Sequence, residues 1–263
     1  MNRMITMLLT ATLAFATVGC ASPEAPRVAE PSVELNVSAA ATLRSVLVST
    51  AQAFEDSENV ELVFNFGASG QLVKQIEGGA PADVILSASP DAITTLVTGG
   101  LASAEESAAF AGNTLVILVP AGNPAGIHGP GDLARADRLT TGDPTVAPYG
   151  QKAREWLAGL GLWDEFESRA VFAANAAQGD DYISRGEVDA GIGFASDARG
   201  RDDIEIAYSV PAGTIEPIEY VGVPLGASSE RVLANAYLSY LLSPEVQKAF
   251  VSGGFTPAGG AAD

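Results

Sequence analysis

The sequence predicts an α/β protein built from two lobes, each a mostly parallel β-sheet flanked by helices. Short apolar, β-branched runs alternate with segments of helical spacing, which is typical of parallel sheets with helical crossovers. Two such alternating series are separated by a Gly/Pro-rich stretch near 120–131. The chain has 263 residues, 47% apolar and 17% charged, so it can form sizeable cores and is too apolar to be disordered.

The first 19 residues are predicted to be a signal peptide. A basic region containing Arg3 precedes an apolar run at 5–18, which is too short for a membrane-spanning helix of about 20 residues. The run ends in Thr17-Val18-Gly19-Cys20, which resembles the lipobox of bacterial lipoproteins, with Thr17 in place of the usual Leu. We therefore expect Cys20 to be lipidated and to become the new N-terminus. The alternative is an ordinary secretory signal with an incidental cysteine.

Residues 20–32 are expected to be the lipidated Cys and a tether. Three prolines in this stretch restrict it to extended conformations and remove backbone donors. The lipid would hold the folded part of the chain at the outer face of a membrane, since no later apolar run approaches the length of a spanning helix.

Composition excludes several function classes. The chain has 14 Lys and Arg against 32 Asp and Glu, a net charge of −18, so nucleic acids and anionic membrane surfaces are poor partners. With one Cys it forms no internal disulfide, and with one His, His128, it has no multi-histidine metal site.

The first series of elements begins directly after the tether. Apolar residues after its first strand recur at the three- and four-residue spacing of a helix, and Pro90 marks a later helix start. The expected strands are at 33–41, 61–66, 83–88 and 113–120, and the expected helices at 42–56, 69–77 and 90–98.

The second series repeats the alternation and ends in two helices. A strong helix is marked by apolar and aromatic residues along its length, and Pro244 starts a shorter helix. The marking residues are Val232, Leu233, Ala236, Tyr237, Tyr240 and Leu241. The expected strands are at 138–141, 170–174, 190–195, 204–210 and 215–226, and the expected helices at 150–160, 178–185, 229–242 and 244–250.

Hydroxyl side chains stand at two of the predicted helix starts. Thr42 follows the first strand, and Ser69 follows the second between Gly67 and Gly70. Each could simply cap its helix. A hydroxyl at this place can also donate to an anion, beside the free N–H groups of the helix. Ligands of open α/β sheets bind beyond the carboxyl ends of strands, so the pair favours an oxyanion cradle.

Several motifs resemble the molybdate-binding proteins of ABC transporters, the ModA family. The motifs span nearly all of the mature chain, and the Gly-Ala-Pro-Ala-Asp sequence at 79–83 is the most specific. They lie at 39–43, 65–72, 75–84, 142–144, 191–198, 240–245 and 254–255. The resemblance implies a type II periplasmic-binding-protein fold with the ligand cleft between its lobes. Lobe 1 would comprise 33–118 and 219–263, and lobe 2 would comprise 119–218.

The resemblance also implies the ligand site. The family's two hydroxyl positions fall on Thr42 and Ser69, and its backbone N–H positions on Tyr149 and Ala176. Its ligand-binding tyrosine falls on Phe194, which has no phenol hydroxyl, so the Tyr149 hydroxyl is a candidate replacement. Thr42, Ser69, Tyr149 and Ala176 would bind metal only as the molybdate or tungstate oxyanion, not as a bare cation. No cofactor and no catalytic residue are expected.

The expected function is that of a lipid-anchored solute-binding protein that captures molybdate or tungstate for an ABC importer. It would be a monomer at the extracytoplasmic face of the membrane, with the permease as its partner. The alternatives are binding of another small anion such as sulfate, or a surface lipoprotein that binds no solute. An enzyme is disfavoured because His128 lies in a loop-like stretch and no Gly-x-Ser-x-Gly motif is present. Asp180-Asp181 and Asp202-Asp203 are expected to be solvated rather than to bind a cation.

Overall fold

The structure, a computed structural model, describes residues 33–145 and 147–257. The predicted signal peptide, Cys20 and the tether lie outside these residues. All the elements below belong to one compact unit, 32–263. Within the described ranges, every helix is either too short or too polar to cross a lipid bilayer.

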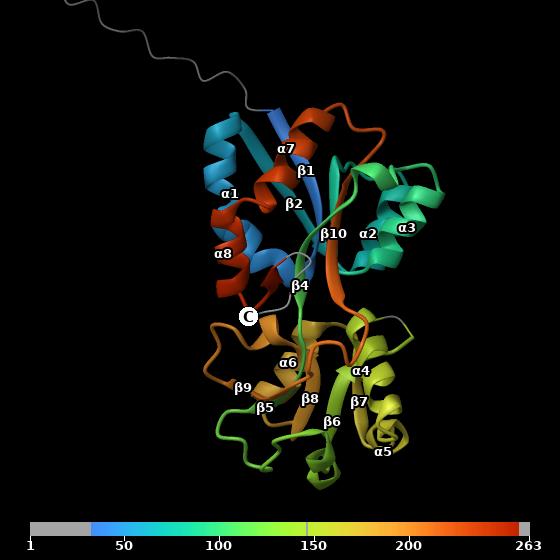
Figure 1. The fold of residues 1–263 in the computed structure, drawn as a ribbon, viewed down its shortest axis with the longest axis vertical. Helices are drawn as coiled ribbons and strands as arrows, with labels where there is room; N and C mark the ends of the chain where they lie inside the picture. The colour runs from blue at the N-terminus through green and yellow to red at the C-terminus, as the bar shows by residue number, and fades with distance from the viewer. Residues whose placement is uncertain (1–32, 146, 258–263) are drawn as a thin grey trace, which may run out of the picture. The chain divides into compact units, whose positions relative to one another are not determined.

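Six strands form the first sheet, in the spatial order β11-β4-β10-β3-β1-β2 (Figure 1). Strand β1 pairs in parallel with β2 and β3, and β10 is antiparallel to β3 and β4. The strands are β1 Val33–Ala40, β2 Val60–Gly67, β3 Val84–Ser87, β4 Ala108–Asn113, β10 Ile218–Pro224 and β11 Thr256–Pro257.

Helices cover both faces of this sheet. In Figure 1, α1, α7 and α8 lie on one side of the strands, and α2 and α3 lie on the other. The bounds are α1 Arg44–Glu58, α2 Ser69–Glu77, α3 Pro90–Thr98, α7 Arg231–Leu241 and α8 Pro244–Ser252, with short 3₁₀ turns at Ala41–Leu43 and Ala104–Glu106.

The second sheet has five strands in the order β7-β6-β8-β5-β9. Strand β6 is parallel to β7 and β8, and β5 is antiparallel to β8 and β9. The strands are β5 Leu115–Pro120, β6 Leu139–Gly142, β7 Ala170–Ala173, β8 Ala190–Phe194 and β9 Ile204–Ser209. The helices are α4 Pro148–Gly159, α5 Trp163–Glu167 and α6 Ala176–Ser184, with 3₁₀ turns at Pro130–Arg135 and Ala195–Ala198.

The predicted α/β class with two helix-flanked sheets is confirmed. Strands β3 and β8 are buried at every residue, as expected for strands covered on both faces. Each sheet is mixed in its pairing, although four of its strands run in one direction. The sequence prediction missed β4, whose Ala- and Gly-rich sequence has low strand propensity; pairing with β10 specifies it. It also missed α5 and β11.

The chain passes between the sheets at two places in the described residues. Strand β5 pairs along its length with β8 and β9, so sheet membership changes at Thr114, ahead of the expected boundary at 118/119. The return runs through 210–217, and Ile218 already pairs with Asn113. The strands with which β5 and β10 pair decide where the chain changes sheet. The apolar sequence at 115–120 predicts a strand but does not indicate which strands it pairs with.

Candidate functional site

Thr42 and Ser69 lie at equivalent places beyond two adjacent parallel strands. The register of β1 and β2 pairs Ala40 with Gly67, and each hydroxyl residue comes two positions later. The carboxyl ends of parallel strands share one edge of a sheet, so the two side chains start from the same edge. This is the arrangement that the spacing of the sequence predicted.

Neither hydroxyl caps a helix. The N-cap of α2 is Ala68, and Ser69 is the first residue of the helix proper; no side-chain capping bond is present there or at the turn containing Thr42. The Ser69 hydroxyl oxygen instead accepts the Ala88 N–H at 3.0 Å. The Thr42 hydroxyl oxygen lies 3.1 Å from the Tyr220 hydroxyl. The capping interpretation is therefore wrong for both residues.

Tyr149, Ala176 and Phe194 form a second group, on the five-stranded sheet. They follow or end three neighbouring strands, β6, β7 and β8. The rings of Tyr149 and Phe194 lie 5.9 Å apart between centroids. Tyr149 and Ala176 line one small cavity of about 10 Å³. The structure thus brings these three predicted residues into one local cluster.

The Tyr149 hydroxyl is an unsatisfied donor. It is buried and has no hydrogen-bond partner among the described residues. Burial, reinforced by the charges of Asp197 and Asp180, raises its pKa above the ordinary tyrosine value, so it stays protonated at neutral pH. An unpaired buried hydroxyl costs free energy, so a ligand oxygen that accepted this hydrogen bond would gain binding energy.

Asp180 and Asp197 are the acidic groups of this cluster. Asp180 is largely buried, with its side chain 13% exposed, so the expectation that it is solvated is wrong. Burial is the main cause that raises the pKa of both carboxyl groups, and the charge of Asp197 raises that of Asp180 further. Arg201, whose Nη1 lies 3.7 Å from Asp180 Oδ2, opposes the shift. Sequence reasoning missed this burial because it comes from the packing of α6 against β8 and against the turn that carries Asp197, which are long-range contacts.

Asp180→Asn is expected to stabilise the protein relative to wild type, by a small amount at pH 5 and by more at alkaline pH. An unfolded aspartate titrates near pH 4. In the folded state burial raises the pKa of Asp180 to about 8. The folded protein therefore keeps a proton that the unfolded chain has lost, and wild-type stability falls as the pH rises from about 4 to about 8. Asparagine cannot ionise, so the difference in melting temperature should grow with pH.

Thermal melts from pH 5 to 9 measure this difference. The matched control is Asp181→Asn, the same change at a neighbouring side chain that is 56% exposed, and it should show no such trend. A constant difference between Asp180→Asn and wild type across the range would contradict the assignment.

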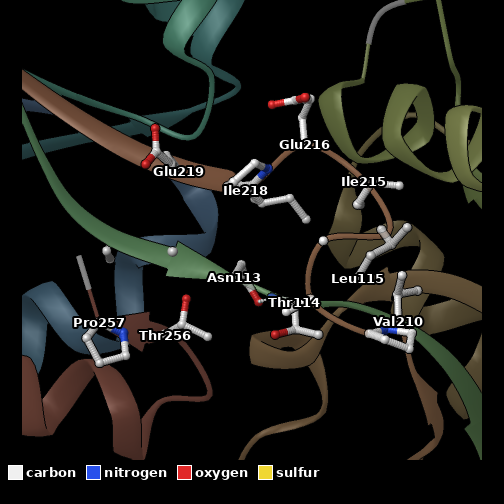
Figure 2. A pocket seen from close by; sticks show the side chains of 16 residues that line it. Asn113, Thr114, Leu115, Val210, Ile215, Glu216, Ile218, Glu219, Thr256 and Pro257 are labelled. Carbon is white, nitrogen blue, oxygen red and sulfur yellow. Dashed lines mark hydrogen bonds between the residues drawn. The ribbon is translucent and has the colours of Figure 1, made fainter. Parts of the chain in front are cut away.

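A larger cavity of about 500 Å³ lies along the two crossovers (Figure 2). Its walls come from 111–115, 210–219 and 256–257, and none of the five predicted residues lines it. Glu216 and Glu219 both contribute to its lining, and their carboxylates would repel an oxyanion. This cavity is therefore a poor candidate for an anion site.

Comparison with known proteins identifies the family. Residues 35–256 match the family described as bacterial extracellular solute-binding protein. YvgL of Bacillus subtilis, assigned as an ABC transporter substrate-binding lipoprotein, is 32% identical over 97% of this chain and 99% of its own. The molybdate-binding protein ModA of Haemophilus influenzae is 30% identical over 86% of this chain and 91% of its own.

A solved structure agrees with these relatives. The substrate-binding domain assigned to a molybdenum ABC transporter of Clostridium difficile aligns with a TM-score of 0.74 and 30% identity, covering 86% of this chain and 100% of that domain. Its fold is the two-lobed type II fold that the sequence predicted. The chain therefore belongs to the bacterial extracellular solute-binding proteins, which bind substrates for ABC importers and are not enzymes.

Proposed function

We propose that this protein captures molybdate or tungstate in a cleft between two lobes, one built on each sheet. Thr42 and Ser69 would donate from the first lobe through their hydroxyls. Tyr149, Ala176 and Phe194 would form the second wall, with backbone N–H groups of Tyr149 and Ala176 as donors. The observation that carries the proposal is the equivalent placement of Thr42 and Ser69 beyond β1 and β2, with neither used as a cap. The names of several relatives, which are molybdate-binding proteins, support it.

Neutral donors would do the binding. The chain carries a net charge of −18, so long-range attraction does not draw a dianion to it. Hydrogen bonds to a charged group contribute about 1.5–3 kcal/mol each, and several converging donors suffice. The groups proposed to contact the ligand are all donors, and this also discriminates: a protonated oxyanion brings a hydrogen for which none of these groups is an acceptor. Phosphate is partly protonated at neutral pH, whereas molybdate and tungstate are not.

Calorimetric titration of the mature protein with molybdate, tungstate, sulfate and phosphate tests the proposal. We expect tight binding of the first two and no measurable heat with phosphate. Preferential binding of sulfate would show that the site is an oxyanion site of another specificity. A protein that bound none of the four would overturn the proposal.

The Tyr149 hydroxyl is expected to take the place of the phenol that Phe194 lacks. It is a buried, unpaired donor in the cavity that Ala176 also lines. Tyr149→Phe should therefore weaken molybdate binding, by about tenfold for one hydrogen bond to a charged group. Phe194→Tyr should leave binding level or weaken it, because the added hydroxyl would compete for occupied space.

A double-mutant cycle decides whether the Tyr149 hydroxyl replaces the missing phenol. Both single variants and the double variant are titrated with molybdate. Tighter binding by Phe194→Tyr, together with no effect of Tyr149→Phe, would show instead that the missing phenol leaves one ligand oxygen without a donor.

We also propose that the protein is held at the membrane through lipidated Cys20. The Thr17-Val18-Gly19-Cys20 sequence and the lipoprotein assignment of YvgL support this. Cys20→Ser is expected to move the protein from the membrane fraction to the soluble extracytoplasmic fraction, with molybdate affinity unchanged. Fractionation followed by titration measures both properties. A Cys20→Ser protein that stayed with the membrane would disprove the anchor.

A further inference from the structure

We propose that Asn113 and Tyr220 are positioning residues that fix the Thr42 hydroxyl as a hydrogen-bond donor toward the bound oxyanion. The inference rests on the proposed function and adds two residues that the sequence analysis did not single out. Its basis is a chain of hydrogen bonds whose direction we infer from the orientation of the Asn113 side-chain amide.

The series of hydrogen bonds starts at Asn113, the last residue of β4 and one of the residues labelled in Figure 2. The backbone N–H of Thr114 donates to Asn113 Oδ1 at 2.9 Å. An N–H group is a donor only, so this bond fixes which side of the amide is oxygen. The opposite nitrogen has two hydrogens and two partners, Ser196 Oγ at 3.0 Å and the Tyr220 hydroxyl at 3.3 Å.

Because Tyr220 accepts a hydrogen bond from Asn113, its own proton is directed to Thr42. Its side chain is fully buried, and its oxygen accepts the hydrogen bond from Asn113. Burial raises its pKa above the ordinary tyrosine value, so it remains protonated. Its own proton then has the Thr42 oxygen, 3.1 Å away, as its partner. The Thr42 oxygen therefore acts as an acceptor toward Tyr220, and no other described residue accepts the Thr42 proton, which can be donated to a ligand.

The Ser69 hydroxyl is likewise left as a donor, through a single hydrogen bond. Its oxygen accepts the backbone N–H of Ala88, and none of the described residues accepts the Ser69 proton. Each hydroxyl oxygen thus accepts a hydrogen bond from a protein donor, Tyr220 for Thr42 and the Ala88 N–H for Ser69. The two side chains are set to present hydrogens, which suits a fully ionised oxyanion and disfavours one that carries a proton.

The other branch from Asn113 ends at the second group of site residues. Ser196 Oγ accepts from Asn113 and lies 3.4 Å from the carboxylate oxygen Oδ1 of Asp197, to which it donates. The other oxygen of Asp197 accepts the Phe194 N–H at 2.8 Å. The same amide therefore anchors a hydrogen-bond path from Thr42 on one sheet to Phe194 on the other.

A double-mutant cycle on Thr42 and Tyr220 tests the relay through molybdate affinity. Tyr220→Phe removes the donor to Thr42 and should weaken binding about fivefold or more in the wild-type background. In the Thr42→Val background, which has no hydroxyl to orient, the same Tyr220→Phe change should alter affinity by less than about twofold. Equal effects in the two backgrounds, or no effect in wild type, would overturn the proposal.

Asn113→Asp supplies an independent readout. An aspartate accepts hydrogen bonds only, so Tyr220 would donate to it, and Thr42 would donate to Tyr220 instead of to the ligand. The ratio of molybdate to phosphate affinity, with phosphate measured by displacement of molybdate, should fall about tenfold or more. The comparison is made at alkaline pH, where phosphate is almost entirely the singly protonated dianion, so the added charge acts on both ligands alike and leaves this ratio unchanged.

A ratio that stays constant while both affinities fall would show a charge effect alone and would overturn the relay. The proposed function fails separately, if the wild-type protein binds no oxyanion at all. Additivity in the Thr42 and Tyr220 cycle, with normal wild-type binding, would remove the relay and leave the proposed function standing.

Discussion

Thr42→Val and Ser69→Ala are each expected to weaken molybdate binding about 10- to 150-fold. Each removes one hydroxyl donor, and a hydrogen bond to a charged group contributes about 1.5–3 kcal/mol. The two residues follow adjacent parallel strands in register, so both donors act at one edge of the first sheet. Titration calorimetry on each variant measures the loss.

Thr50→Val is the matched control for the threonine change. Thr50 lies further along α1, and its hydroxyl donates only to backbone carbonyls of its own helix, so molybdate affinity should be unchanged. Ser69→Ala also leaves the Ala88 N–H without its partner, so thermal melts must accompany its titration. If both site variants bound molybdate within about twofold of wild type, the assignment of the anion site would be wrong.

Gly150→Ala is expected to cause the largest loss of stability. A Cβ atom at this position would lie 2.1 Å from the carbonyl oxygen of Gly142 and 2.6 Å from its carbon. Both atoms are backbone, so helix α4 would have to move away from β6. Overpacking of this kind costs about 3 kcal/mol or more, which corresponds to a fall in melting temperature of about 6–12 °C. Molybdate affinity should fall as well, because α4 carries Tyr149.

Gly159→Ala is the control in the same helix. Its Cβ position faces open space, and alanine is the better helix former, so this variant should be neutral or stabilised by about 0.5–1 kcal/mol. A Gly150→Ala protein that melted together with Gly159→Ala would show that α4 does not need close contact with β6.

The sequence by itself determined the class of the fold and the order of most of its strands and helices along the chain. Helices α2 and α3 have the predicted bounds, 69–77 and 90–98, because amphipathic spacing and a helix-starting proline are local properties. The placement of Thr42 and Ser69 after neighbouring strands could also be predicted, because parallel strands bring their carboxyl ends to one edge.

Only the tertiary structure decided the partners of these residues. Tyr220 lies 178 positions from Thr42 along the chain, and Asn113 lies 107 positions from Tyr220. Strand β4, which brings Asn113 to this place, has weak strand propensity and is specified by pairing with β10. The burial of Asp180 and the change of sheet at Thr114 are likewise set by long-range pairing. Side-chain hydrogen bonds depend on which strand ends meet in space, and no local pattern of residues encodes that meeting.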